Sequence, residues 1–125
     1  MFHGAQYNWY AISTNKLCPT GWHVSQRSDW LDLINFVGAD SAFWKLASET
    51  GWEYNNGTNK LCFNAFPGGQ RTYGFYNEHY RSYWWTTNNY DDTTVWCEYL
   101  DSYWAGYLED RDYKFTGNSV RCVKN

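Results

Sequence analysis

Residues 25–38, which read SQRSDWLDLINFVG, decide the fold class of this chain. From Trp30 to Val37 the apolar side chains follow the i, i+3, i+4, i+7 spacing of a helix that buries one face. Polar residues fill the positions between them, and Gly38 is a residue type at which helices commonly end. We therefore expect an amphipathic helix of about three turns. Ser25 is the expected cap at its start.

Extended segments flank this helix, and a second short helix is expected over 41–48. The segment 7–12 is aromatic-rich and predicts a strand, and 17–24 predicts a turn followed by extended chain. Asn56-Gly57 is a strong turn signal. After it no helical period returns. The later segments that predict strands are 83–87, 94–100 and 118–124, separated by polar stretches at 88–93 and 101–116.

This order of elements predicts an α+β fold, with an antiparallel sheet and helices on one side. At 125 residues the chain is expected to form a single domain, residues 1–125. The residues expected to be largely buried lie on the helix stripe or in the strand segments: Trp30, Leu33, Val37, Trp84 and Trp96.

Aromatic residues are more numerous than a core of this size can use. The chain holds 9 Trp, 12 Tyr and 7 Phe, and Tyr and Trp need partners for their polar ends when buried. Most of the tyrosines fall between Tyr73 and Tyr113, interleaved with Asn, Asp, Ser and Arg. That mixture is typical of recognition surfaces, although a Trp- and Tyr-rich core in a loop-rich fold is the alternative.

Charge excludes one class of partner. The net charge is −3, and residues 88–113 carry seven acids against the single base Arg111. A nucleic-acid groove needs the opposite sign, so no nucleic acid is expected as a partner. No apolar run approaches the ~20 residues of a membrane span, and the first ten residues lack the pattern of a secretion signal.

Catalytic and metal-binding patterns are not found. The cysteines Cys18, Cys62, Cys97 and Cys122 contain no Cys-x-x-Cys pair, so no zinc or iron–sulfur site is expected, and their spacing leaves every disulfide pairing open. If the chain stays in a reducing compartment, all of them are thiols.

The histidines His3, His23 and His79 lack metal-ligand spacing. Glu98 and Asp101 are a weak match to glycosidase carboxylates, and no Gly-x-Ser-x-Gly or phosphate-binding loop occurs. We expect no enzyme, no cofactor and no catalytic metal.

Several phrases resemble the Fibrobacter succinogenes major paralogous domain and occur in that family's order across nearly the whole chain. These phrases are YNWYAI (7–12), KLCPTGWHV (16–24), NAFPGGQR (64–71), YWWTT (83–87) and GNSVRCVKN (117–125). The resemblance implies a C-type-lectin-like fold, in which the first and last strands pair and a long excursion carries the ligand-facing surface.

The resemblance also bears on the cysteines and on calcium. Cys18 and Cys122 lie in matching phrases near the terminal strands, which implies a disulfide between them. Cys62 and Cys97 depart from the family pattern, so they pair with each other or Cys97 occupies a variable position. Asp91-Asp92 and residues 109–112 offer oxygens, but the sequence lacks the calcium-site phrases of sugar-binding C-type lectins.

The chain also resembles the variable proteins of diversity-generating retroelements, which display residues mutated at the adenines of Asn-type codons. Trp104 is not reachable from such a codon. The reachable residues between 97 and 113 are Cys97, Tyr99, Asp101, Tyr103, Gly106, Leu108, Asp110, Arg111, Asp112 and Tyr113.

About 17 residues separate the strand ending near 100 from the one starting near 118, and a connection of that length is usually functional. We therefore expect one solvent-facing ligand-binding surface there, joined by neighbouring loops. Its expected residues are Tyr76, Tyr90, Asp91, Tyr99, Asp101, Tyr103, Trp104, Leu108, Asp110, Arg111, Asp112 and Tyr113.

The leading functional hypothesis is a display module that binds a protein or cell-surface ligand, located outside the cell, on its surface or on a viral particle. The alternative is calcium-independent carbohydrate binding, for which exposed rings would need to share a plane at sugar spacing. A third hypothesis is an assembly domain that buries these rings between copies.

Overall fold

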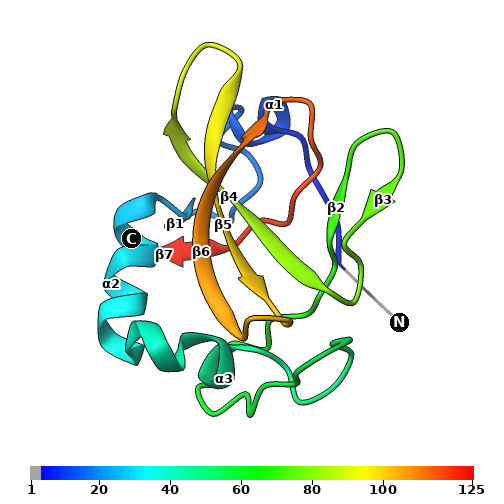
Figure 1. Ribbon diagram of the computed structural model, residues 1–125. Coiled ribbons are helices and arrows are strands. Elements are labelled where there is room, and N and C mark those ends of the chain that lie inside the picture. The colour runs from blue at the N-terminus through cyan, green and yellow to red at the C-terminus, as the bar shows by residue number, and fades with distance from the viewer. Residues whose placement is uncertain (1–3) are drawn as a thin grey trace.

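A three-stranded antiparallel sheet of β4 (Arg81–Asn89), β5 (Thr94–Asp101) and β6 (Gly106–Tyr113) crosses the molecule, in the order β4-β5-β6. The computed structural model describes residues 4–125 (Figure 1). The two hairpin turns of this sheet lie at opposite ends of β5, one at the top and one at the bottom of Figure 1. Because the two turns lie far apart, candidate site residues in one turn are separated from those in the other.

Helices and terminal segments cover the two faces of this sheet. The helices are α1 (Trp9–Ile12), α2 (Arg27–Val37), the short 3-10 helix η1 (Ala39–Ser41) and α3 (Ala42–Leu46). Successive residues of a strand point to opposite faces, so β4 and β5 contribute side chains to two hydrophobic cores, one on each face of the sheet. On one face Trp84 packs with Trp30 of α2, and on the other Trp85 packs with Ile12 of α1.

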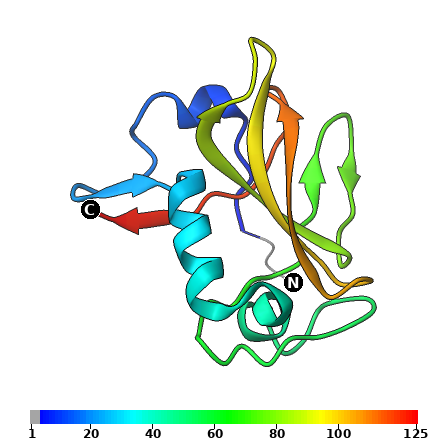
Figure 2. The same cartoon turned by 60° about the vertical axis from the view of Figure 1, so that its left-hand side comes forward.

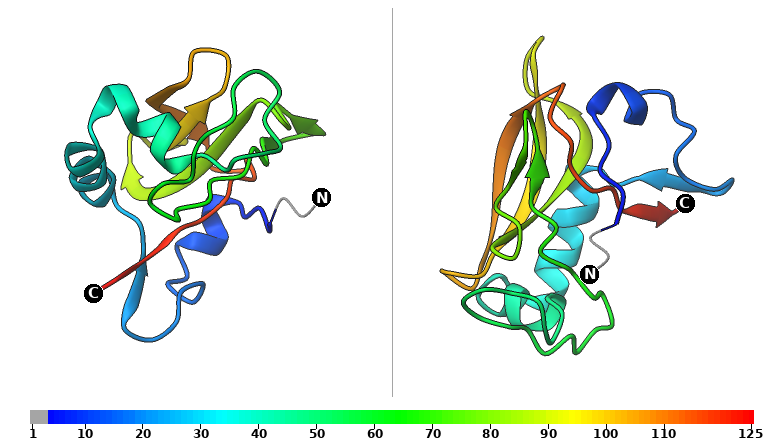
Figure 3. Two further views of the ribbon diagram at one scale, coloured as in Figure 1. Left: turned by 90° about the horizontal axis from the view of Figure 1, so that it is seen from below. Right: turned by 90° about the vertical axis from the view of Figure 1, so that its right-hand side faces the viewer.

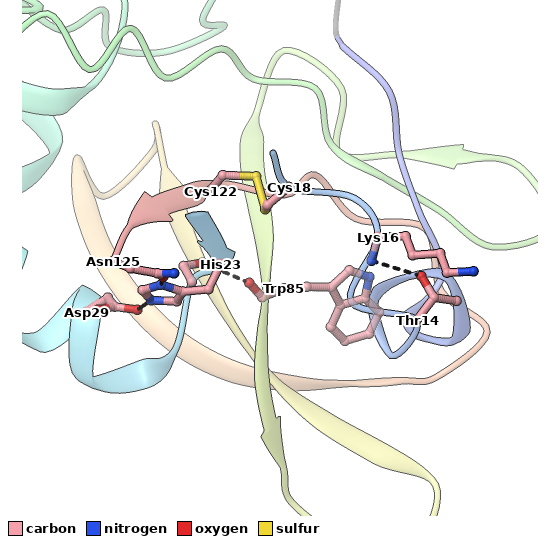
Figure 4. Close-up of a disulfide and its surroundings, with 9 residues drawn as sticks. Thr14, Lys16, Cys18, His23, Asp29, Trp85, Cys122 and Asn125 are labelled. Atoms are coloured by element: carbon pink, nitrogen blue, oxygen red, sulfur yellow. Dashed lines mark hydrogen bonds and ion pairs between the residues drawn. A yellow bond between two sulfur atoms is a disulfide. The ribbon is translucent and has the colours of Figure 1, made fainter. Parts of the chain in front are cut away.

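The terminal strands β1 (Trp22–Val24) and β7 (Cys122–Lys124) pair antiparallel beside α2, apart from the central sheet (Figure 2). The Cys18–Cys122 disulfide joins the segment before β1 to β7, with 5.7 Å between the two Cα atoms (Figure 4). Both the pairing of the first and last strands and the disulfide were expected, and both are confirmed. A small hairpin of β2 (Gln70–Arg71) and β3 (Phe75–Tyr76) stands to one side of the sheet (Figure 3).

Helix α2 forms where the apolar spacing predicts it. It ends at Gly38, whose φ of 86° suits glycine. The start differs from the prediction, because Gln26 precedes the first helical residue and its backbone N–H donates to the Asp29 carboxylate at 2.8 Å. Ser25 is buried instead, and its hydroxyl accepts the Trp30 indole N–H at 2.9 Å.

The predicted core is confirmed in its main members. Trp30, Val37 and Trp84 are 3%, 2% and 2% exposed, whereas Leu33 and Trp96 are half-buried. The second helix, α3, is shorter than the predicted 41–48. It buries Phe43 and Leu46 and leaves Trp44 exposed.

Three local predictions are wrong. Residues 9–12 form helix α1 rather than part of a strand, because Asn8 caps the aromatic segment by accepting from the Ala11 N–H at 3.0 Å. Asn56-Gly57 forms no tight hairpin and instead packs against the end of α3, where the Gly57 N–H donates to the Ser48 carbonyl at 2.9 Å. The stretch 101–116 is not one long loop, because strand β6 occupies its centre.

Candidate functional site

The turn between β5 and β6, residues 102–105, is built around one carboxylate. Oδ1 of Asp101 accepts the backbone N–H of Tyr103 at 2.9 Å and that of Trp104 at 3.1 Å. Ala105 then takes a positive φ of 50°, which turns the chain into β6. The turn holds two large rings in solvent, since Tyr103 is 53% and Trp104 72% exposed.

Asp101 also forms an ion pair with Arg81. Its Oδ2 accepts from Arg81 Nε at 2.7 Å, and Arg81 Nη1 donates to the Tyr83 hydroxyl at 3.1 Å. Burial alone lowers the pKa of Arg81, but its contacts with Tyr83 and Asp101 outweigh burial and raise that pKa. The expectation that Asp101 faces solvent is wrong, because it is fully buried and fixes the turn from below.

Aromatic rings surround this ion pair. Tyr54 meets Tyr80 at 5.5 Å between ring centroids and Tyr103 at 5.1 Å, with interplanar angles of 70° and 88°. Tyr103 meets Trp104 at 4.8 Å and 88°. The Arg81 guanidinium lies 4.9 Å from the centroid of the Tyr80 ring. These contacts make the cluster continuous from the loop that carries Tyr54 to the β5–β6 turn.

The cluster continues onto the sheet. Tyr99 lies 5.2 Å from the Arg81 guanidinium and pairs across the strands with Leu108, so the two side chains point to the same face. We call the six residues of this cluster the aromatic face: Tyr54, Tyr80, Tyr99, Tyr103, Trp104 and Leu108.

Tyr54 and Tyr80 are members that sequence reasoning missed. Tyr54 lies in a polar loop far from the strands, and its place depends on a long-range contact in which Asn55 Nδ2 donates to the Ser102 carbonyl at 2.8 Å. The backbone of the same loop is held where the Glu53 N–H donates to the His79 carbonyl at 2.6 Å. The sequence around Tyr54 carries no signal for either contact.

Tyr90 and Asp91 lie at the other end of β5, in the β4–β5 turn (Figure 1). Asp91 Oδ1 accepts the N–H groups of Thr93 and Thr94 at 2.9 and 2.7 Å, and these hydrogen bonds lower the pKa of Asp91 to about 2. Tyr90 packs its ring 5.1 Å from that of Trp96, on the sheet face that carries the helices. The prediction that these residues join one surface with Tyr103 is therefore wrong.

Successive residues of β6 point to opposite faces of the sheet, so the remaining predicted site residues lie on two different faces. Arg111 pairs with Trp96 and stacks 4.1 Å over Tyr90, and Tyr113 stacks on Phe115 at 5.4 Å with an interplanar angle of 6°. Leu108, Asp110 and Asp112 lie on the opposite face from Arg111. Of these, Leu108 and Asp110 are exposed.

Asp112 is half-buried and forms hydrogen bonds with residues inside the protein. Its Oδ2 accepts from Asn118 Nδ2 at 2.8 Å and from the Cys97 thiol at 3.4 Å, and burial raises the pKa of Asp112. Burial likewise raises the pKa of Cys97, which disfavours the reactive thiolate form of this buried thiol.

Tyr76, on β3, is 50% exposed and lies beside this region, because the next residue, Asn77, donates from Nδ2 to the Tyr83 hydroxyl at 3.0 Å. Of the predicted site, the structure thus brings together Tyr99, Tyr103, Trp104 and Leu108, with Tyr76 nearby.

No group of three metal-ligating side chains occurs within residues 4–125. His23 is held between Asn125 and Asp29, with Nδ1 and Nε2 at 2.6 and 2.9 Å from their oxygens, and these contacts raise its pKa (Figure 4). His3 lies outside the described residues. Within the described part of the chain, no helix has the length and apolar character needed to cross a membrane.

A comparison of the sequence with protein-family models gives one match. The model of the Fibrobacter succinogenes major domain matches residues 2–124. The chain belongs to this family. Comparisons with curated proteins and with solved structures gave no match. In this Fibrobacter succinogenes major domain Cys62 and Cys97 are free rather than bridged, Cys62 exposed and Cys97 buried.

Proposed function

We propose that this domain is a non-catalytic display module that binds a protein or cell-surface ligand through the aromatic face. The observation that carries the proposal is the β5–β6 turn. Asp101 fixes it by backbone hydrogen bonds, and it presents Tyr103 and Trp104 more than half exposed beside an equally exposed Tyr54. Rigid rings of this kind supply contact area at a small cost in side-chain entropy.

Ring geometry favours a protein ligand over a sugar. A sugar-stacking platform needs rings that share a plane, whereas the rings of the aromatic face cross at 70° to 88°. The carbohydrate alternative has one observation in its favour. Tyr113 and Phe115 lie nearly parallel, at 6°, and each is more than half exposed. They lie toward the opposite end of the sheet from the aromatic face.

Burial of two carboxylates, Glu98 and Asp101, supports a role without catalysis. Glu98 and Asp101, the carboxylates that resemble a glycosidase pair, are both fully buried. Glu98 accepts a hydrogen bond from the Tyr107 hydroxyl, and Asp101 is occupied by Arg81.

The proposal includes a C-type-lectin-like fold and retroelement-driven variation of the display surface. Support for the fold comes from the paired terminal strands, with helices α2 and α3 between β1 and the central sheet. Among the residues reachable from Asn codons, Tyr99, Tyr103 and Leu108 belong to the aromatic face. Cys97 and Asp101 are buried, so we expect them to stay constant. The nucleotide sequence tests this: a template repeat that differs at adenines in these codons, beside a reverse transcriptase gene, is expected.

The Cys18–Cys122 disulfide supports an extracellular location, on the cell or on a viral particle, because disulfides persist in oxidising compartments.

The binding experiment compares two double variants, each of which removes two rings that are more than half exposed, from opposite ends of the sheet. Each domain is immobilised and exposed to cell-envelope proteins. We expect Y103A/W104A to lose a partner that the parent domain retains, although the melting temperature of this variant equals that of the parent. Y113A/F115A is expected to keep that partner. Retention of cellulose or xylan by the parent and by Y103A/W104A, but not by Y113A/F115A, would instead support the carbohydrate alternative.

A further inference from the structure

A cavity of about 580 Å³ lies between α2, the segment 61–63 and β7, and it shares no residue with the aromatic face. Its volume is in the range of small-molecule sites. The cavity opens beside Leu61 and Cys62, which are both exposed. Its apolar wall consists of Trp30, Leu33, Leu61, Phe63 and Val123.

Arg121 supplies the cavity with a cation that has no acid partner. Its backbone is fixed, because its carbonyl accepts the Ser25 N–H at 2.9 Å. The guanidinium lies 4.2 Å from the centroid of the Phe63 ring, and Nη2 donates to the Phe63 carbonyl at 2.9 Å. No carboxylate among residues 4–125 forms an ion pair with it. Burial lowers the pKa of Arg121, as expected for a desolvated cation without a counter-ion.

The two acids at the cavity do not neutralise Arg121. Asp29 is occupied by His23, at 2.9 Å, and by the N–H of Gln26 at the start of α2. Asp32 is exposed, so water screens its charge more than that of Arg121. A dianion such as a phosphate monoester would still be repelled by both acids, which favours a singly charged ligand.

We propose that this cavity binds a small organic monocarboxylate with an apolar body. The carboxylate accepts from the free N–H groups of Arg121, and the body packs against Trp30, Leu33 and Phe63. Arginine is well suited to this because its planar fork matches carboxylate geometry. Binding at this site is separate from ligand capture by the aromatic face.

Cys62 provides a local readout, because it lines the mouth of the cavity, whereas the other free thiol, Cys97, is buried. The probe is 3-phenylpropionate, and the measurement is the rate at which iodoacetamide alkylates Cys62. We expect the carboxylate to slow alkylation saturably. The uncharged 3-phenylpropanol, the cationic 3-phenylpropylamine and phenyl phosphate are expected to slow it less.

Matched variants assign the effect to charge. R121Q is expected to weaken 3-phenylpropionate binding by roughly tenfold or more, because a charge-assisted contact is lost. The control R111Q changes an exposed arginine of β6 that does not line the cavity, and it is expected to have no effect. D32N removes a negative charge from an exposed residue at the cavity, so it is expected to tighten 3-phenylpropionate binding about twofold. This second variant tests the proposal even if R121Q fails to fold.

Equal protection of Cys62 by the amine or the alcohol would overturn the proposal, as would unchanged affinity in both R121Q and D32N. Stronger protection by phenyl phosphate would overturn the choice of a monocarboxylate. Capture of a partner by the aromatic face, measured with and without 3-phenylpropionate, reports separately on the proposed function.

Discussion

Two aspartates play the same part at opposite ends of β5. Asp91 and Asp101 each accept two backbone N–H groups from the residues that follow them, and so each fixes a hairpin turn. They differ in burial, since Asp91 is exposed and Asp101 is fully buried with Arg81 as its counter-ion. Only at Asp101 does the turn also depend on an ion pair inside the protein.

Replacing Asp101 by Ala should therefore destabilise the domain by about 3–5 kcal/mol, because it leaves Arg81 without its acid and two N–H groups without an acceptor. Urea unfolding measures this change. The control is D110A, an exposed acid on the neighbouring strand, which should change the free energy of unfolding by less than about 0.5 kcal/mol. Equal stability of the two variants would contradict the structural role assigned to Asp101.

Glu98 should make stability depend on pH. Burial raises its pKa from 4.5 to about 7, against the lowering effect of the Tyr107 hydrogen bond. The folded state then holds a proton that the unfolded state releases, so this contribution is complete below about 4.5 and is lost as pH rises through about 7. The free energy of unfolding, measured by urea at a series of pH values, is expected to fall over that window.

The variant E98Q isolates this contribution, because it keeps the size of the side chain and cannot ionise. The difference in unfolding free energy between the parent and E98Q should shift in favour of E98Q as pH rises from about 4.5 to about 7. A pH-independent difference would show that Glu98 titrates alike in the folded and unfolded states.

Among the elements, α2 was predictable and β6 was not, for the same physical reason. The stripe from Trp30 to Val37 is periodic because one face of α2 is buried against the sheet. Strand β6 is an edge strand with mostly exposed side chains, so its sequence, GYLEDRDY, has no apolar alternation to reveal it. Strand β6 is held by backbone hydrogen bonds to β5, which its side chains do not reveal. Because this pairing was not predicted, the predicted site residues were not expected to divide between the two ends and the two faces of the sheet.

The loop that carries Tyr54 depends on a glycine. A Cβ built on Gly57 would lie 2.1 Å from the Ala47 carbonyl oxygen, at the end of α3. We expect G57A to lower the free energy of unfolding by about 1–3 kcal/mol or to displace the loop and its tyrosine. Chemical denaturation and the near-ultraviolet circular dichroism of the ring cluster report the two effects.

The matched control for this prediction is G74A, at the tip of the β2–β3 hairpin, where an added Cβ meets no atom within 4 Å. This variant should leave stability within about 0.5 kcal/mol of the parent. If G57A is equally harmless, the loop does not approach α3 as closely as described.

On the scale of the whole molecule, one sheet separates two cores. The larger core lies between the sheet and helices α2 and α3, and the smaller one lies under the terminal segments. The disulfide closes the smaller side by linking residues 104 positions apart. The pairing of Cys18 with Cys122 was implied only by the family resemblance, because spacing alone allows other pairings.

Reduction of this disulfide should lower stability by a few kcal/mol, because a closed loop of about 100 residues restricts the unfolded chain strongly. A fall of roughly ten degrees or more in melting temperature is expected on adding dithiothreitol. The C18S/C122S variant serves as the control, and its melting temperature should not respond to the reductant. An unchanged melting temperature of the reduced parent would refute this contribution.

The same disulfide sets how the domain carries mechanical load. A pull on the two ends of this chain passes from the N-terminal segment through the Cys18–Cys122 bond to the last residues, and the chain between the two cysteines lies outside that path. Only the residues outside the disulfide loop, those before Cys18 and those after Cys122, can be drawn out. Tension would strip α1 from the smaller core while the aromatic face, which lies within the disulfide-closed loop, keeps its shape. In the reduced form the same pull would act on the whole chain.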